Sequence, residues 1–166
     1  MTIPAPAPRH DLFRLLLASA FGLGLCPIMP GTVGALLGLA WHFGALALGL
    51  GGLALRAACL AGVILFSLLH YALTPWAQRH WNDPDPGHFV LDEVVGYLCV
   101  PVLAIETHDW RFVLLGFAIE RAFDIVKLPG ARYIDRHIHT ASGVLFDDVV
   151  SAVYAAIVLS AILYFR

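Results

Sequence analysis

Long apolar segments separated by short polar loops make up most of this 166-residue chain. No stretch shows the strict alternation of apolar and polar residues that is typical of a half-buried strand. Because a helix needs about 20 largely apolar residues to cross a membrane, the two shortest segments are expected to extend into their polar flanks. The pattern predicts an all-α, polytopic membrane helical bundle with about five apolar segments, at 33–50, 53–75, 92–105, 112–127 and 144–165.

The N-terminal region differs from the rest of the chain. Residues 1–10 are rich in proline and are predicted to form a disordered tail. Residues 11–25 are apolar but short and contain Arg14, which is typical of a helix that lies in the membrane interface. The sequence shows no internal repeat, so residues 11–166 are predicted to form a single membrane-embedded domain.

The composition supports a membrane protein. The chain is 60% hydrophobic and 13% charged, whereas soluble domains average about 45–50% apolar and about 25% charged residues. There is no basic patch suited to nucleic acid. Cys26, Cys59 and Cys99 are far apart and form no C-x-x-C pair, which argues against a disulfide framework or a cysteine zinc site. No G-x-S-x-G occurs, so nucleophilic serine or cysteine catalysis is not expected.

Basic residues are distributed unevenly over the two faces that five crossings would define. The N-terminal tail and the loops before residue 33, at 76–91 and at 128–143 then share one face. That face holds Arg9, Arg14, Arg79, Arg121, Lys127, Arg132 and Arg136, and the other face holds Arg56, Arg111 and Arg166. The excess of lysine and arginine predicts that the first face is cytoplasmic. The unusual polar motifs of the chain all lie on it.

Two pairs of neighbouring carboxylates open apolar segments on this face. Asp92 and Glu93 lie in "FVLDEVVGYL", and Asp147 and Asp148 lie in "GVLFDDVV". A carboxylate at membrane depth costs about 2.5–3.5 kcal/mol, and several converging acids also repel one another. A hard divalent cation such as Mg²⁺ takes oxygen ligands and would relieve both effects. The alternative is that the acids begin helices, where the helix dipole favours negative charge.

The stretch "RAFDIVK" adds cationic side chains. Arg121, Asp124 and Lys127 follow one another at intervals of three residues and share an arc of about 120° on a helix. An acid flanked by two bases suits a metal-bound phosphate. The alternative is an intrahelical ion pair with a lysine stem lying along apolar surface. In the basic loop that follows, His137 and His139 are interpreted as headgroup or phosphate contacts, or as solvated residues.

The loop "PGTVG" opens the first long apolar segment. Backbone amides at a helix N-terminus bind anions, and the Thr32 hydroxyl adds a donor beside Gly31. The alternative is an ordinary helix start. Gly34 and Gly38 also fit the small-residue face along which helices pack closely.

Four motifs in this order, "CPIMPGTVG", "DPGHFVLDEVVG", "RAFDIVKLPGARYIDRHIH" and "GVLFDDVVSAVYA", resemble the phosphatidylglycerophosphatase A family from about residue 19 to the C-terminus. The resemblance implies a small multi-pass enzyme of the bacterial inner membrane with its site on the cytoplasmic side. Such enzymes are Mg²⁺-dependent and remove the terminal phosphate of phosphatidylglycerophosphate to give phosphatidylglycerol. Its implied partners are this phospholipid and membrane lipids, not nucleic acid.

The motifs and the resemblance together predict the site residues. Catalytic roles fall on Asp92, Glu93, Asp124 and Asp148; metal binding falls on Asp92, Glu93, Asp124, Asp147 and Asp148; substrate binding falls on Gly31, Thr32, Asp85, Arg121, Lys127, Arg136 and His139. The chain departs from the family pattern after Lys127, where Leu-Pro-Gly replaces Pro-x-Pro. It also departs at Glu120, an acid where apolar residues are commoner.

Alternatives stay open at this point. The attack on phosphorus could come from water, with a carboxylate as base, or from an aspartate that forms an acyl phosphate. A CDP-alcohol phosphotransferase would show a long Asp-Gly-rich motif, which is missing here. A membrane cation or proton transporter would place its acids near mid-membrane in broken helices, whereas these acids cluster toward one face.

Overall fold

The computed structural model describes residues 9–138 and 140–166, which form seven α-helices and one short 3-10 helix and contain no strand. The elements are α1 (Arg9–Ala18), η1 (Leu23–Leu25), α2 (Pro30–Ala47), α3 (Gly52–Trp81), α4 (Leu91–Leu103), α5 (Trp110–Val126), α6 (Ala131–His137) and α7 (Ala141–Tyr164). The predicted all-α class is confirmed. Of the predicted tail at 1–10, residues 1–8 lie outside the described residues, and residues 9 and 10 begin α1.

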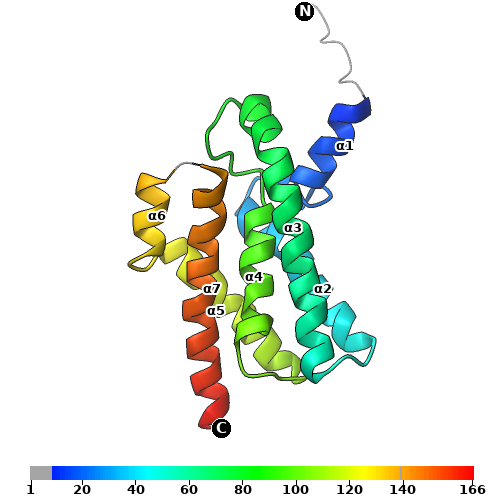
Figure 1. Ribbon diagram of the computed structural model, residues 1–166, viewed down its shortest axis with the longest axis vertical. Helices are drawn as coiled ribbons and strands as arrows, with labels where there is room; N and C mark the ends of the chain where they lie inside the picture. Colours follow the sequence, from blue (N-terminus) through cyan, green and yellow to red (C-terminus); the bar gives the residue numbers. More distant parts are fainter. Residues whose placement is uncertain (1–8, 139) are drawn as a thin grey trace, which may run out of the picture.

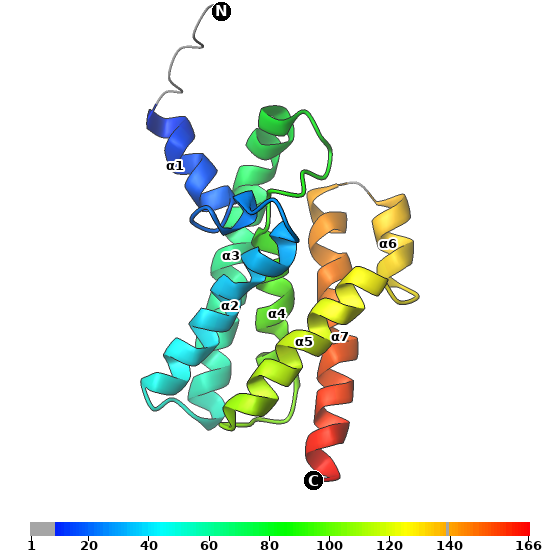
Figure 2. The same cartoon turned by 180° about the vertical axis from the view of Figure 1, so that it is seen from behind.

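Helix α4 forms the centre of the bundle. The other long helices, α2, α3, α5 and α7, surround it, and the short α6 lies outside against α7 (Figures 1 and 2). Nearly every side chain from Leu91 to Val100 is buried. The segment that begins with Asp92 and Glu93 is therefore almost entirely buried within the bundle.

Helices α2 and α4 pack closely because α2 presents glycines to α4. A Cβ atom at Gly34 would collide with the Val90 side chain, and one at Gly38 would lie 3.0 Å from the Val94 carbonyl oxygen. In contrast, a Cβ at Gly44 on the same helix would meet nothing within 4 Å. The predicted small-residue packing face at Gly34 and Gly38 is confirmed.

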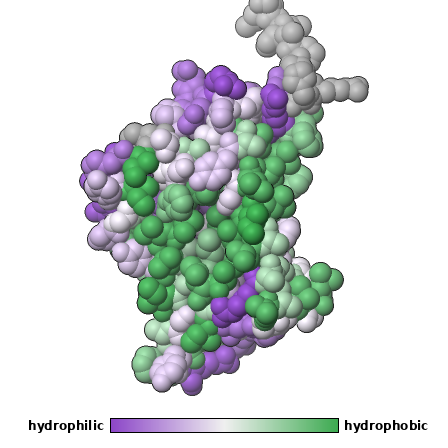
Figure 3. Space-filling model, in the orientation of Figure 1, coloured by the Kyte–Doolittle hydropathy of each residue, from purple (hydrophilic) through white to green (hydrophobic). Residues whose placement is uncertain are grey.

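Two helices in the described part of the chain, α3 and α7, are long and apolar enough to cross a membrane. On the face shown in Figure 3, apolar side chains form a broad band across the middle of the molecule, and hydrophilic side chains gather mostly toward its two ends. The helices and the surface fit a membrane-associated protein.

The predicted count of about five spanning segments is not confirmed. Helix α4 has 13 residues and rises only about 20 Å at about 1.5 Å per residue, which is short of a bilayer core of about 30 Å. Its polar flank does not extend it, because residues 83–90, which include Pro84 and Pro86, form turns and irregular structure rather than helix. Helix α5, with 17 residues, is also short.

The N-terminal apolar segment is not one helix as predicted. Helix α1 ends at Ala18, and the φ angles at Ala20, Phe21 and Gly22 are 49°, 61° and 94°. These left-handed conformations turn the chain before η1 begins at Leu23. The segment at 11–25 is therefore a short helix, a tight turn and a single 3-10 turn. The predicted loop at 128–143 likewise contains an unpredicted helix, α6.

Candidate active site

Acidic side chains from three helices converge at one end of the bundle. Asp92 and Glu93 lie in the first turn of α4, Asp124 lies near the end of α5, and Asp147 and Asp148 lie in the second turn of α7. The ends of these helices come together in Figure 2. We call these five residues the acid cluster. They line a cavity of about 110 Å³ with the segment 85–87, Phe89, Lys127 and Val144. The structure thus brings all five predicted metal ligands together.

The acid cluster contains two overlapping groups of three carboxylates. Asp92, Glu93 and Asp148 form one group, and Asp124, Asp147 and Asp148 form the other; in each, one oxygen per residue lies within 4.8 Å of the others. In the first group, Asp92 Oδ1, Glu93 Oε2 and Asp148 Oδ2 are buried with no hydrogen-bond partner among the described residues.

Unpartnered buried oxygens are costly, and native proteins contain few of them. Three in one group of carboxylates are a donor set for a hard cation, which takes oxygen ligands. The residues present therefore fit Mg²⁺, and the first group fits it better than the second.

Lys127 already occupies the second group. Its ammonium pairs with Asp147 Oδ2 and lies 3.5 Å from Asp124 Oδ1 and 4.0 Å from Asp148 Oδ1. Burial disfavours the charged form, but the carboxylates of Asp148, Asp147 and Asp124 outweigh it and raise the pKa of Lys127 above its ordinary value. Lys127 ends α5 with a φ angle of 51°, so the chain turns there and the side chain enters the cavity.

Arg121 is placed differently from Lys127. It is buried, and it is not among the described residues that line the cavity. Its Nε and Nη2 donate to the two carboxylate oxygens of Glu120 at 2.7 Å each, and its Nη1 lies 3.3 Å from Asp124 Oδ2. The contact with Asp124 is the intrahelical ion pair that was the alternative interpretation. A direct contact between Arg121 and a phosphate stays a prediction.

Of the remaining predicted substrate contacts, only some lie at the cavity. Asp85 is exposed and lines it. Gly31 lies against the acid cluster, since a Cβ there would collide with Glu93 Oε1. Thr32 is half-buried and Arg136 is exposed on α6, and neither is among the described lining residues. His139 lies outside the described residues.

Two buried histidines have partners that the sequence did not suggest. His70 on α3 hydrogen-bonds through Nε2 to the Ala141 carbonyl at 2.9 Å, and its ring stacks on Phe89 with centroids 4.9 Å apart. His70 thus ties α3 to the start of α7 and to the loop before α4. His42 on α2 hydrogen-bonds through Nδ1 to the Tyr97 hydroxyl at 2.9 Å. These partners are 71 and 55 residues away in the chain, so no local spacing could have indicated them.

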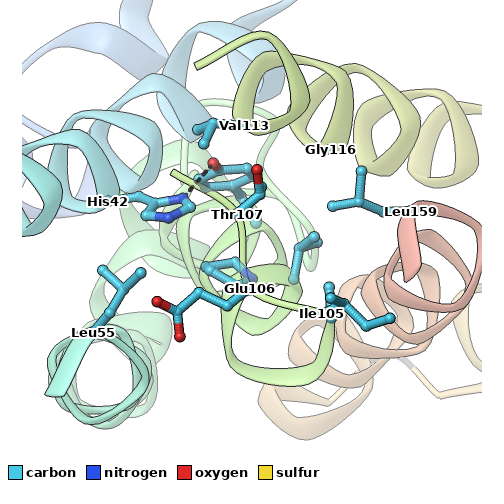
Figure 4. A pocket seen from close by; sticks show the side chains of 12 residues that line it. His42, Leu55, Ile105, Glu106, Thr107, Val113, Gly116 and Leu159 are labelled. Carbon is cyan, nitrogen blue, oxygen red and sulfur yellow. Dashed lines mark hydrogen bonds between the residues drawn. The ribbon is translucent and has the colours of Figure 1, made fainter. Parts of the chain in front are cut away.

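Another cavity surrounds the His42–Tyr97 pair toward the opposite end of α4 (Figure 4). It has a volume of about 20 Å³, which is room for about one water molecule. Its lining is largely apolar, and its carboxylate, Glu106, accepts a hydrogen bond from the Gly52 amide at 2.6 Å. With one engaged acid and little space, this cavity is not the candidate active site.

Fold and site together define a class of protein: an apolar, membrane-associated helical bundle with a carboxylate-rich cavity at one end that suits a cation and a phosphate group. Comparison with known proteins narrows this class. A model of the family described as Phosphatidylglycerophosphatase A matches residues 16–163. The chain belongs to this family and is an enzyme of phospholipid metabolism.

The names of two individual relatives agree with this family assignment. The chain is 37% identical to a Haemophilus influenzae protein named Phosphatidylglycerophosphatase A, over 90% of this chain and 88% of the relative. It is 33% identical to an Escherichia coli protein of the same name, over 90% of this chain and 81% of the relative. A Bacteroides thetaiotaomicron protein, provisionally named as a phosphatidylinositol-3-phosphatase, is 35% identical over 92% of this chain and 94% of its own length. No solved structure matches the chain.

Proposed function

We propose that this chain hydrolyses the terminal phosphomonoester of phosphatidylglycerophosphate in a Mg²⁺-dependent reaction that yields phosphatidylglycerol and phosphate. The observation that carries the proposal is the acid cluster, with its three unpartnered oxygens, within residues 16–163 that the family model matches. The names of the Haemophilus influenzae and Escherichia coli relatives support the substrate. Nothing in the comparisons supports the transporter alternative.

The carboxylates of Asp92, Glu93 and Asp148 would hold the cation, because one oxygen of each lies within 4.8 Å of the others and each residue has a buried oxygen without a hydrogen-bond partner. When bound there, Mg²⁺ would neutralise charge on the phosphate and make the phosphorus more susceptible to attack. The donor set matches this ion, since Mg²⁺ is commonly held by a few carboxylates together with substrate phosphate oxygens.

The residues around the cation have separate tasks in this proposal. Lys127, whose ammonium enters the cavity, binds a phosphate oxygen, while Asp124 and Asp147 hold its side chain in place. A carboxylate of the cluster accepts a proton from the attacking water as its oxygen bonds to phosphorus. The bond between phosphorus and the glycerol oxygen then breaks, and that oxygen takes up the proton from the carboxylate as phosphatidylglycerol leaves.

Phosphate release from phosphatidylglycerophosphate tests this function directly. The purified protein in detergent micelles should release phosphate in the presence of Mg²⁺, and a chelator should reduce the rate at least about 100-fold. Restoring free Mg²⁺ should restore the rate, because chelation removes the cation and leaves the bundle folded. Full activity in excess chelator would contradict the metal requirement while leaving the substrate assignment in place.

We further propose that the chain crosses the bacterial inner membrane several times, with the acid cluster at the cytoplasmic face. The apolar surface band, the two long apolar helices and the uneven distribution of lysine and arginine support this orientation. Cysteines introduced at Asp85 and Arg136 should react with an impermeant thiol reagent from the cytoplasmic side, and one at Gly51 from the opposite side. Labelling of positions 51 and 85 from the same side would contradict the orientation.

A further inference from the structure

Glu120 is the most deeply buried acid near the site, yet it does not line the cavity. Its side chain has no solvent exposure and lies in the interior between α5 and α4. Helix α4 makes room for it with Gly96, where a Cβ atom would lie 3.0 Å from Glu120 Oε1 and 3.0 Å from the Asp148 Cβ. The carboxylate of Glu120 therefore lies close behind the acid cluster.

Glu120 accepts two hydrogen bonds from the guanidinium of Arg121. The Nε and Nη2 atoms of the guanidinium donate to both carboxylate oxygens at 2.7 Å in a two-bond fork, a strong and geometrically restrictive arrangement. Only Nη1 is directed at the acid cluster, and it reaches Asp124 at 3.3 Å. The unpartnered oxygens of Asp92, Glu93 and Asp148 are left without a guanidinium contact.

This arrangement matters because Arg121 and a divalent cation would compete for the same carboxylates. A guanidinium released from Glu120 would keep only its contact with Asp124 and would lie beside the cluster, where interactions between buried charges are strong. It would pair with carboxylates that otherwise bind the cation, and its charge would lower the attraction for any cation. Glu120 cancels that charge and fixes the direction of the side chain.

We propose that Glu120 is a positioning residue that holds Arg121 away from the carboxylates of Asp92, Glu93 and Asp148 and so preserves their affinity for a divalent cation. The inference rests on the proposed Mg²⁺-dependent function. It assigns Arg121 to the organisation of the cluster rather than to the substrate, and it gives a role to an acid that no motif explained.

The test is the affinity for Mn²⁺, used as a paramagnetic probe for the cation and measured by electron paramagnetic resonance on the purified protein. Glu120→Gln keeps the shape of the side chain but removes its charge and one of the two acceptors. We expect about 10-fold weaker Mn²⁺ binding, the scale typical of residues that orient metal ligands. The Mg²⁺ concentration for half-maximal activity should rise similarly, with the lipid KM unchanged.

A second substitution separates this role from a merely structural one. In Glu120→Gln/Arg121→Gln both charges are gone, so Mn²⁺ affinity should return to within about 3-fold of wild type, since the net charge behind the cluster is then restored. The matched control is Glu106→Gln, the same chemical change at the acid beside His42. It should leave Mn²⁺ affinity and activity unchanged.

If Glu120→Gln does not fold, Glu120→Asp takes its place, because a carboxylate one methylene shorter cannot hold both arginine nitrogens. The expected loss of affinity is then about 3-fold, and it should again vanish when Arg121→Gln is added. Equal Mn²⁺ affinity in wild type and the Glu120 variant, or a loss that persists without Arg121, would overturn the inference alone. Failure of the wild-type protein to bind Mn²⁺ would overturn the proposed metal dependence and this inference with it.

Discussion

Replacing Asp148 by asparagine is expected to reduce phosphate release on the order of 1,000-fold, or about 4 kcal/mol in activation free energy. Asp148 belongs to both groups of the acid cluster and has an unpartnered buried oxygen. The substitution keeps the size of the side chain but removes its charge. The measurement is phosphate release from phosphatidylglycerophosphate in saturating Mg²⁺, with thermal unfolding followed in parallel.

Stability should not decrease along with activity. Asp148 lies buried beside other carboxylates, so neutralising it relieves repulsion, and the melting temperature should stay the same or rise. A purely structural residue would lose both properties together. Asp109→Asn is the matched control, because Asp109 caps the N-terminus of α5 at the other end of the bundle and asparagine caps nearly as well. An Asp148→Asn protein with more than about a tenth of wild-type activity would contradict a central role in catalysis.

The second large effect concerns the substrate. Phosphatidylglycerophosphate should be hydrolysed with a kcat/KM at least about 100-fold above that of water-soluble glycerol phosphate, because its acyl chains add binding energy of about 0.8 kcal/mol per buried methylene group. The cavity lies at the end of a bundle whose flanks expose many large apolar side chains. A lipid held along these flanks presents its headgroup at the cavity, whereas a soluble ester must bind through its phosphate alone.

The terminal monoester should react and the internal diester should not. A terminal phosphate carries close to two negative charges at pH 7 and offers three free oxygens to the cation and to Lys127, while a diester carries one charge and offers two. Phosphate release at matched lipid and soluble ester concentrations in the same micelles provides the comparison. Phosphatidylinositol 3-phosphate belongs in the same assay, since one relative is provisionally named for that activity. Equal specificity constants for lipid and soluble monoester would contradict a lipid substrate.

The sequence allowed the acid cluster to be predicted because its members carry local signals. Paired acids at the starts of apolar segments and an acid three residues before Lys127 are rare in an apolar chain, and each points to a helix end. The membrane crossings were predicted less well, because segment length was inferred from hydropathy alone. The prolines before α4 and the left-handed turn at 20–22 limit the helices in ways that mean hydropathy does not record.

The pairing of Glu120 with Arg121 could not be predicted from spacing. Neighbouring residues on a helix point about 100° apart and do not normally meet, so the spacing pattern connected Arg121 to Asp124 instead. The pair forms because both side chains are long and because Gly96 on α4 leaves space for the carboxylate. The hydrogen bond between His42 and Tyr97 escaped prediction for a related reason, since it depends on which faces α2 and α4 turn toward each other.

The position of Asp147 and Asp148 on the last helix has a consequence for how the enzyme is made. During synthesis Asp92 and Glu93 enter the bundle first, and the chain that follows supplies Asp124 and Lys127 before α7 exists. The cavity lacks the carboxylates of Asp147 and Asp148 until α7 has been synthesised, so a product truncated before α7 lacks the residue shared by both groups of carboxylates. In the proposed reaction, phosphate release then requires that α7 has docked, because a chain without α7 cannot supply Asp148 to the acid cluster.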